Sequence, residues 1–214
     1  MGKKSFISIF HKIVYNFTNN KIDPLKIKKL NEFIYSFIEN FFVKYDFLAS
    51  SYASIYEDSV KRELSLLDVN RKTKILHIGC GSLPLTVKYL YKYTPAELIV
   101  GIDNTRRAVK NAKLYLGREN IRGRVRIEHG DGVSYELEDF DIIFLSWGVE
   151  PREKVLHNIF GSIRKNGKVV LRLPSKDCLD EKLKRMINKH GMVIADQVDR
   201  PFFGSAVSIL LMKK

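Results

Sequence analysis

The sequence predicts an α/β protein: a Rossmann-like, doubly wound sheet of seven strands with an antiparallel last strand, preceded by an N-terminal helical extension. Three observations support this prediction. Short apolar runs alternate with amphipathic stretches from residue 72 onward, as strands alternate with covering helices. The last two runs are joined too closely for a crossover helix, and residues 1–68 instead follow helical spacing. The chain therefore divides into a helical region, residues 1–68, and a sheet domain, residues 69–214.

The helical region places apolar residues at steps of three and four. Asp23 and Pro24 suit the start of a helix, because aspartate caps the first turn and proline is tolerated there. The apolar face that follows consists of Ile27, Leu30, Phe33, Ile34, Phe37 and Ile38. A second helix is expected from about Ser54 to Leu67. Neither helix has an obvious partner face within this region, so both should pack on the sheet domain.

Five apolar runs of the sheet domain are expected to form parallel strands, because amphipathic stretches separate most of them. These runs are Ile75–Ile78, Leu98–Ile102, Val125–Ile127, Ile142–Leu145 and Val169–Leu173. Two more, Met192–Val198 and Ala206–Met212, are linked by a short turn and must be antiparallel. Five parallel strands followed by such a pair is the arrangement of class I methyltransferase folds. A plain dinucleotide-binding domain would continue with parallel strands.

The composition is that of an ordinary globular protein, with 45% hydrophobic and 29% charged residues among 214. A chain of this length can bury a core without disulfides or a structural metal. Its two cysteines, Cys80 and Cys178, lie far apart, which argues against a disulfide framework and a zinc site. No apolar run has the length of a membrane span. These features predict a cytoplasmic protein, monomeric or homodimeric, without a bound metal ion.

The net charge of +13 is uneven along the chain. Residues 1–30 carry seven lysines against one acid, Asp23. Such an excess can attract nucleic acid or an anionic membrane. The lysines are spread among apolar residues and no RNA-binding module is recognisable, which favours a solvated surface and a small-molecule substrate. An RNA-binding modification protein or a non-catalytic adaptor stays an alternative.

The strongest candidate for a ligand site is the segment Gly79–Thr86, which follows the first strand and opens a helix. Gly81 lets the backbone turn tightly and approach a ligand closely. Pro84 suits the first helical turn, whose amide groups would face that ligand. The third glycine of a dinucleotide fingerprint is missing, which counts against NAD. The alternative is an ordinary strand-to-helix turn.

Acidic residues follow the second and third strands. Asp103 and Asn104 lie about twenty residues beyond the glycines, where a carboxylate can accept hydrogen bonds from both ribose hydroxyls. Asp103 could instead cap the helix that starts near Thr105. Asp131 and Gly132 follow the third strand, where a carboxylate can accept a hydrogen bond from the adenine amine. The alternative for that segment is a turn without ligand contact.

The fourth strand is followed by Ser146 and Trp147 at the carboxyl edge, where open α/β sheets bind ligands. Trp147, the only tryptophan, could alternatively be a core aromatic. The residues expected to bind the cofactor are therefore Gly79, Cys80, Gly81, Ser82, Pro84, Thr86, Asp103, Asn104, Asp131, Gly132, Ser146 and Trp147.

The segment Gly79–Thr86, with its Leu83-Pro84-Leu85-Thr86 end, resembles the glycine loop of the nicotianamine synthase family. The stretch Phe144–Ile159, the strand of Arg172 and the closing strand Ser208–Lys213 are similar to that family as well, so that the resemblance covers residues 52–214. It implies S-adenosylmethionine as the cofactor. It also implies transfer of the 3-amino-3-carboxypropyl group to a small molecule with release of methylthioadenosine.

The resemblance further implies a catalytic tyrosine before the glycine loop and a glutamate from the N-terminal helices. Tyr56 matches the tyrosine by its distance from the loop, and Tyr52 is its neighbour. Glu32 or Glu39 could supply the glutamate. The alternative for Tyr56 is an aromatic residue that packs a helix.

Two residues are expected to bind the substrate. Arg172 could hold a carboxylate through paired donors, or else be a surface arginine. Glu150 belongs to the loop after the fourth strand.

This chain departs from the family in a shorter N-terminal part and in Ser82, where proline is common. A shorter enclosure suggests a smaller nucleophile, or cyclisation of S-adenosylmethionine itself to azetidine-2-carboxylate. A conventional methyltransferase of small molecules uses the same cofactor residues and stays the main alternative.

Overall fold

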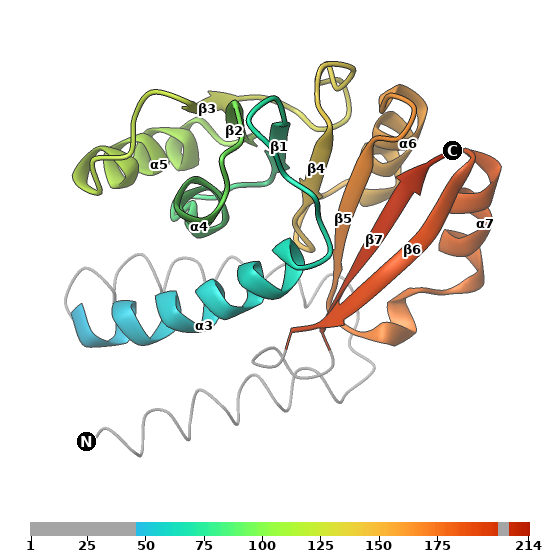
Figure 1. Ribbon diagram of the computed structural model, residues 1–214, viewed down its shortest axis with the longest axis horizontal. Coiled ribbons are helices and arrows are strands. Elements are labelled where there is room, and N and C mark those ends of the chain that lie inside the picture. Colours follow the sequence, from blue (N-terminus) through green and yellow to red (C-terminus); the bar gives the residue numbers. More distant parts are fainter. Residues whose placement is uncertain (1–45, 201–205) are drawn as a thin grey trace.

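The computed structural model describes residues 46–200 and 206–214. In this part of the chain seven strands form one sheet in the order β3-β2-β1-β4-β5-β7-β6 (Figure 1). The strands are β1 Lys74–Ile78, β2 Leu98–Asp103, β3 Val125–His129, β4 Ile142–Leu145, β5 Lys168–Leu173, β6 Met192–Asp199 and β7 Val207–Lys213. Strands β1 to β5 are parallel, and β7 runs antiparallel to both β5 and β6. The predicted sheet, including its antiparallel last strand, is confirmed.

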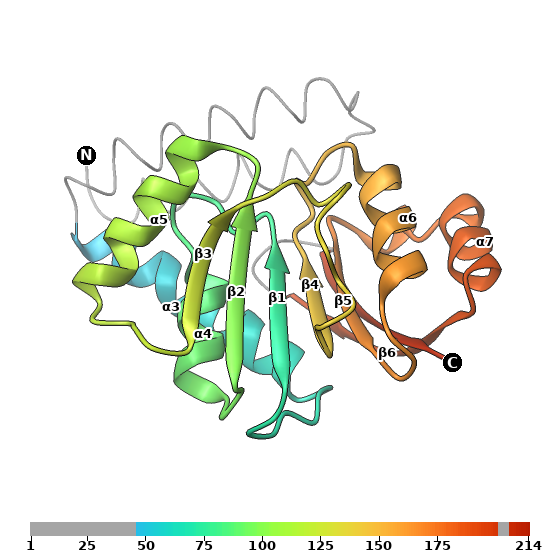
Figure 2. The same cartoon turned by 90° about the horizontal axis from the view of Figure 1, so that it is seen from above.

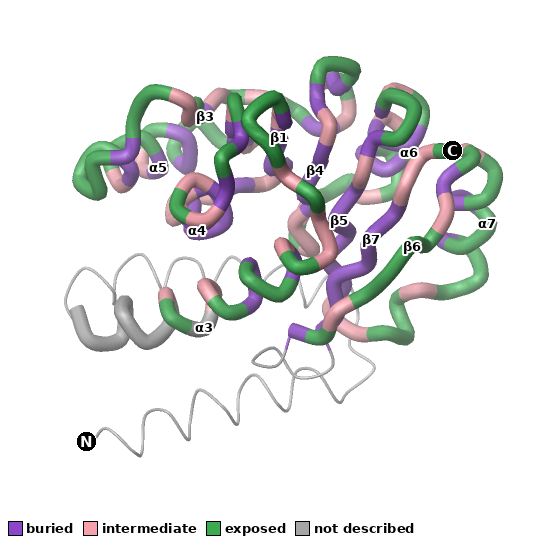
Figure 3. Tube along the Cα trace, in the orientation of Figure 1, coloured by how far each residue is buried: buried purple, intermediate pink, exposed green. Residues whose placement is uncertain are grey.

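Helices cover both faces of the sheet (Figure 2). Helices α3 Asp46–Leu64, α4 Leu85–Tyr93 and α5 Arg106–Arg118 lie on one face, and α6 Arg152–Ser162 and α7 Glu181–Lys189 lie on the other. A short 3₁₀ helix, Lys176–Cys178, precedes α7. Because β1, β2, β4 and β5 are buried on both faces, their sequences are continuous apolar runs (Figure 3).

The strand order reverses between β1 and β4, because β1 pairs with β2 on one side and with β4 on the other. The loops that follow these two strands leave the sheet in different directions and border the crevice in which open α/β sheets bind ligands. The fold therefore brings the glycine segment after β1 next to the loop after β4.

The helix bounds agree broadly with the sequence. The helix expected over about Ser54–Leu67 is α3, which the structure describes from Asp46 to Leu64. Helices α4 and α6 begin directly after Pro84 and Pro151. The helix expected after Pro24 and the lysine-rich segment, residues 1–30, lie outside the described residues. None of the described helices has the length and hydropathy needed to cross a bilayer.

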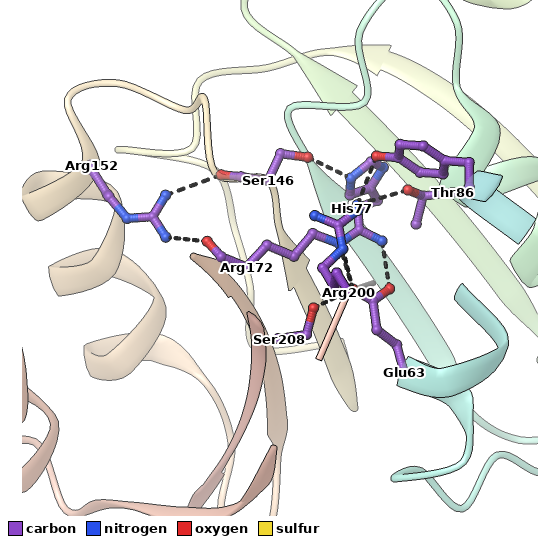
Figure 4. Close-up of polar contacts among 9 residues, drawn as sticks. Glu63, His77, Thr86, Ser146, Arg152, Arg172, Arg200 and Ser208 are labelled. Carbon is purple, nitrogen blue, oxygen red and sulfur yellow. Dashed lines mark hydrogen bonds and ion pairs between the residues drawn. The ribbon is translucent and has the colours of Figure 1, made fainter. Parts of the chain in front are cut away.

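A buried ion pair attaches α3 to the sheet (Figure 4). The Glu63 side chain is 0% exposed and the Arg172 side chain 1%. Arg172 Nε donates to Glu63 Oε1 at 2.8 Å, and Arg172 Nη2 donates to Oε2 at 2.6 Å. Ser208 Oγ also donates to Oε1, at 2.5 Å. Side chains of α3, β5 and β7 are thus joined by charge-assisted hydrogen bonds.

We predict that Glu63→Ala lowers the free energy of unfolding by about 3–5 kcal/mol, because it leaves the Arg172 charge buried without its carboxylate partner. Urea unfolding measures the change. Glu57→Ala is the matched control on the same helix. Its ion pairs with Lys61 and Lys92 lie at the surface, where such pairs contribute about 0–1 kcal/mol. Similar losses in the two variants would contradict the prediction.

Candidate functional site

The loop after β1 turns through two glycines in the left-handed region. Gly79 has a φ of 77° and Gly81 a φ of 67°. The backbone N–H groups of Gly79 and Cys80 both donate to the carbonyl of Ile102, each at 2.9 Å. These hydrogen bonds hold the loop against the carboxyl end of β2, in a conformation that other residues adopt only with strain.

The two glycines serve different purposes. A Cβ at Gly79 would lie 2.4 Å from Val149 Cγ2 and 3.3 Å from the Ser146 Cβ, so this position is needed for packing against the loop after β4. A Cβ at Gly81 would meet no atom within 4 Å. Open space therefore borders the Gly81 backbone.

Asp103 joins the glycine loop to the next helix. Its Oδ2 accepts a hydrogen bond from the Gly81 N–H at 2.9 Å, and its Oδ1 accepts one from the Thr105 N–H at 3.0 Å. The hydrogen bond from Thr105 lies just before α5, where the sequence allowed a capping role, and ribose binding by Asp103 stays a prediction. Each carboxylate oxygen can accept a second hydrogen bond, so both retain capacity for ribose hydroxyls.

The segment after β3 is less defined as a site. Asp131 is exposed, and its Oδ1 accepts a hydrogen bond from the Val133 N–H at 2.9 Å. A Cβ at Gly132 would lie 2.8 Å from Ile78 Cγ2, so packing requires this glycine. Asn104 is exposed, and its carbonyl lies 3.0 Å from His129 Nε2. Contact of Asp131 and Asn104 with a ligand stays a prediction.

The loop after β4 is held by Arg152 of α6. Its Nη1 donates to the carbonyls of Ser146 and Trp147, and its Nη2 donates to the carbonyl of Arg172 at 2.7 Å. Trp147 is half-buried. Sequence analysis did not single out Arg152, although an arginine in the first turn of α6, beside the loop, was a signal for this role.

His77 is a second residue that the sequence did not reveal, since it lies within an apolar strand. Its imidazole is buried, and its Nε2 lies 2.8 Å from Ser146 Oγ. Burial and the Arg172 and Arg200 guanidinium groups hold its pKa well below the usual range, so the ring is neutral. Among the described residues its Nδ1 has no hydrogen-bond partner. We therefore assign the proton to Nε2, which donates to Ser146 and leaves that hydroxyl proton free to donate to a ligand.

Several residues that were expected to bind the cofactor are buried within the protein. The Cys80 thiol is buried, and burial together with the Asp103 charge raises its pKa to about 12. Thr86 is also buried, and its Oγ1 accepts a hydrogen bond from Arg172 Nη1 at 2.9 Å. The Thr86 hydroxyl is thus already hydrogen-bonded within the protein, and its contact with the cofactor stays a prediction. Ser82 is half-buried and Pro84 is buried.

The expectation that Arg172 holds a substrate carboxylate needs correction, because Glu63 of the protein already occupies its paired donors. Its remaining terminal nitrogen, Nη1, donates to Tyr56 at 3.1 Å as well as to Thr86. Glu63 was missed from the sequence, although a charged residue in the apolar run of β5 signals a buried partner.

Tyr56 lies on α3, two helical turns before Glu63, and is half-buried. The Arg172 and Arg200 guanidinium carbons each lie 5.6 Å from its ring centroid. Burial raises the pKa of the Tyr56 phenol, but these two cations and the Thr86 hydroxyl together lower it by more, so that the net pKa is below the usual value. Glu32, Glu39 and the Tyr52 side chain lie outside the described residues.

Glu150 makes a local contact. Its Oε2 accepts a hydrogen bond from the Arg152 N–H at 3.0 Å, at the start of α6. The side chain is exposed, so a substrate role stays a prediction. Within the described residues, no three His, Cys, Asp or Glu side chains converge in a way that could hold a metal ion.

Comparison with known proteins supports this reading of the fold. A family described as a methyltransferase domain matches residues 75–167. A probable cobalt-precorrin-6B C(15)-methyltransferase (decarboxylating) from Saccharolobus solfataricus is 25% identical over 111 residues, which are 50% of this chain and 56% of that protein. The chain thus spans little more than half the length of this relative.

Two solved structures are similar in fold. MtNAS, a nicotianamine synthase in complex with MTA and tNA, superposes with a TM-score of 0.62 at 20% identity, over 75% of this chain and 61% of that one. A methyltransferase from Pyrococcus furiosus has a TM-score of 0.58 at 21% identity, over 72% and 81%. At these identities the structures establish the Rossmann-like methyltransferase fold, and the domain match supports S-adenosylmethionine as the cofactor.

We predict that Gly81→Ala mainly weakens ligand binding, whereas Gly79→Ala mainly lowers stability. Both carry strain of about 1–2 kcal/mol from the left-handed backbone. Gly79→Ala also clashes with Val149 and should lose more stability in urea unfolding. Gly81→Ala places a methyl group in the open space and should weaken S-adenosylhomocysteine binding, followed by the fluorescence of Trp147. Unchanged binding by a folded Gly81→Ala protein would contradict this assignment.

We predict that Asp103→Ala weakens S-adenosylhomocysteine binding by about 1–3 kcal/mol, because the ribose hydroxyls and the Gly81 N–H lose their acceptor. Calorimetry measures the affinity. Asp139→Ala, which removes an exposed acid before β4, is the control and should bind normally. An unchanged affinity of Asp103→Ala would mean that other groups hold the ribose.

Proposed function

We propose that this chain is an S-adenosylmethionine-dependent transferase that moves the 3-amino-3-carboxypropyl group to an amine of a small molecule and releases methylthioadenosine. In the alternative form of this reaction, the amine of the 3-amino-3-carboxypropyl group itself is the nucleophile, and the group cyclises to azetidine-2-carboxylate. The observation that carries the proposal is a continuous network between the glycine segment and α3. Thr86, the last residue of Leu83-Pro84-Leu85-Thr86, and Tyr56 share one donor atom of Arg172. The network thus connects the segment that resembles nicotianamine synthases to the tyrosine that the resemblance marks as catalytic.

The residues at the carboxyl edge fit the cofactor. Gly81 borders open space, and the Asp103 carboxylate has acceptor capacity directly beside it. In our proposal Asp103 binds the ribose, Asp131 binds the adenine amine, and Ser146 donates its hydroxyl proton to a polar group of the ligand. When bound, S-adenosylmethionine supplies a sulfonium whose three attached carbons are all open to a nucleophile. The pocket therefore selects the reaction through the carbon that it presents.

We assign to Tyr56 the role of accepting the proton from the amine nucleophile. An amine attacks through its lone pair, so the ammonium form must first lose a proton. The phenol oxygen of Tyr56 accepts a hydrogen bond from a cation, and the nearby guanidinium groups lower its pKa. Both features favour the deprotonated form, which is the form that can accept that proton.

Conventional methyl transfer is the second candidate, and it is favoured by the methyltransferase-domain match and by the Saccharolobus relative. The cofactor residues are common to both reactions, because adenosine is bound in the same way in each. The difference must come from the residues that enclose the sulfonium substituents.

Product analysis distinguishes the two reactions. We predict that the full-length protein, incubated with S-adenosylmethionine and a panel of primary and secondary amines, releases methylthioadenosine. Chromatography with mass detection identifies the nucleoside, and a reaction without added amine tests for azetidine-2-carboxylate. Asp103→Ala should slow formation of either nucleoside and serves as the control for enzymatic turnover. Release of S-adenosylhomocysteine instead would establish methyl transfer and refute the proposal.

A further inference from the structure

The guanidinium of Arg172 is oriented by its partners. Nε and Nη2 donate to the two oxygens of Glu63, at 2.8 and 2.6 Å. A guanidinium is planar and rigid, so this two-point contact fixes the direction of the third nitrogen. That nitrogen, Nη1, donates to the Tyr56 hydroxyl at 3.1 Å and to Thr86 Oγ1 at 2.9 Å. Glu63 therefore determines where Arg172 presents its remaining donors.

Glu63 is itself held firmly. Ser208 Oγ donates to its Oε1 at 2.5 Å, and Arg200 Nε lies 3.7 Å from the same oxygen. Glu63 and Tyr56 are seven residues apart on α3, so they lie on the same helix face, two turns apart. The contact that fixes the carboxylate thus also fixes the height of Tyr56 above the sheet.

We propose that Arg172 and Glu63 are positioning residues: Glu63 aims Arg172, and Arg172 holds the Tyr56 oxygen as an acceptor for the proton of the substrate amine. The proposal rests on the proposed function for the identity of that substrate group. In the step that it describes, an N–H bond of the ammonium breaks, its electron pair stays on nitrogen, and an O–H bond forms on Tyr56. Neither Arg172 nor Glu63 gains or loses a proton.

The surroundings of Tyr56 agree with this role. Among the described residues, the charged groups that act on it are Arg172 of β5, Arg200 beyond β6 and Glu63 of α3. The two cations favour the phenolate, whereas Glu63 opposes it. The two-point contact between Glu63 and Arg172 anchors α3, and Tyr56 takes no part in that contact. The hydrogen bond from Nη1 places the phenol oxygen of Tyr56 directly against the anchored cation.

The first test measures Tyr56 ionisation without any substrate. The phenolate absorbance of each protein is measured against pH, and the same curve is measured for that protein with Tyr56→Phe. The difference between the two curves cancels the signal of the other nine tyrosines and leaves that of Tyr56. The double variant Glu63→Leu, Arg172→Met should raise the pH at which Tyr56 ionises, because the Arg172 cation lowers the pKa of Tyr56 more than the Glu63 carboxylate raises it. Arg172→Lys keeps the positive charge but lacks the planar fork of donors. We expect it to raise the pH at which Tyr56 ionises by less than the double variant does.

The double variant removes the Glu63 and Arg172 charges together, so neither of these two is left buried without the other, although the buried Arg200 guanidinium loses its contact with Glu63. Circular dichroism establishes that it is folded. Arg124→Lys is the matched control. Arg124 also lies over a tyrosine ring, that of Tyr91 at 4.8 Å, and donates to backbone carbonyls remote from Tyr56. It should leave the titration of Tyr56 unchanged. A folded double variant that ionises Tyr56 at the wild-type pH would overturn the proposal.

The second test uses turnover. Below the Tyr56 transition, kcat should fall about tenfold for each unit by which the transition rises, because the proton acceptor is present in proportionally smaller amount. KM should stay within about twofold, and kcat should recover at alkaline pH. Equal losses at every pH would assign a structural role to the pair and refute the proposal. If S-adenosylhomocysteine is the product, the proposed function fails, while the Tyr56 titration still decides the positioning role.

Discussion

The position of α3 depends on the buried ion pair between Glu63 and Arg172. Two charges removed from water lose several kcal/mol of hydration each, and only close pairing with further hydrogen bonds compensates for that loss. Here Ser208, Tyr56 and Thr86 provide those hydrogen bonds, from β7, α3 and α4. Because a shift of α3 by one turn would separate the charges, the pair specifies a single register for the helix. Apolar packing of α3 on the sheet could tolerate several registers and would not specify one.

At the other half of the carboxyl edge, the backbone provides the constraint. Gly79 is needed because the loop after β4 packs directly against it, and Gly81 is needed because the chain turns in the left-handed region. The Asp103 carboxylate fixes that turn by accepting the Gly81 N–H. Since the same carboxylate also accepts the N–H of Thr105, its direction is set before any ligand binds. Such preorganisation lowers the cost of binding, because little has to be ordered when the ligand arrives.

Much of the fold could be predicted from the sequence, because strands buried on both faces must be continuous apolar runs and a short link forces the last two to be antiparallel. Asp103 could be placed for a similar reason, since its position at the end of β2 follows from the order of elements. The partner of Arg172 could not be predicted. The chain has 24 acidic residues, and no rule of spacing selects one that lies 109 positions away. His77 was hidden because its neighbours in β1 are apolar, and only the packed structure brings it to Ser146.

The two halves of the carboxyl edge differ in the function that we propose for them: one binds the cofactor and the other determines the reaction. The β1–β3 half carries Gly81, Asp103 and Asp131, which we propose to bind the adenosine part of S-adenosylmethionine whichever carbon at its sulfonium reacts. These residues therefore do not distinguish methyl transfer from aminocarboxypropyl transfer. The half formed by β4, β5 and β7 carries the polar network beneath α3, where Tyr56 is held by a cation and Ser146 by a neutral imidazole. In the function that we propose, Tyr56 as proton acceptor and Ser146 as hydroxyl donor would determine which nucleophile is activated and how the ligand chain is oriented. Reaction type should accordingly follow the residues beneath α3, and substitutions there should change the product more readily than substitutions around the adenosine.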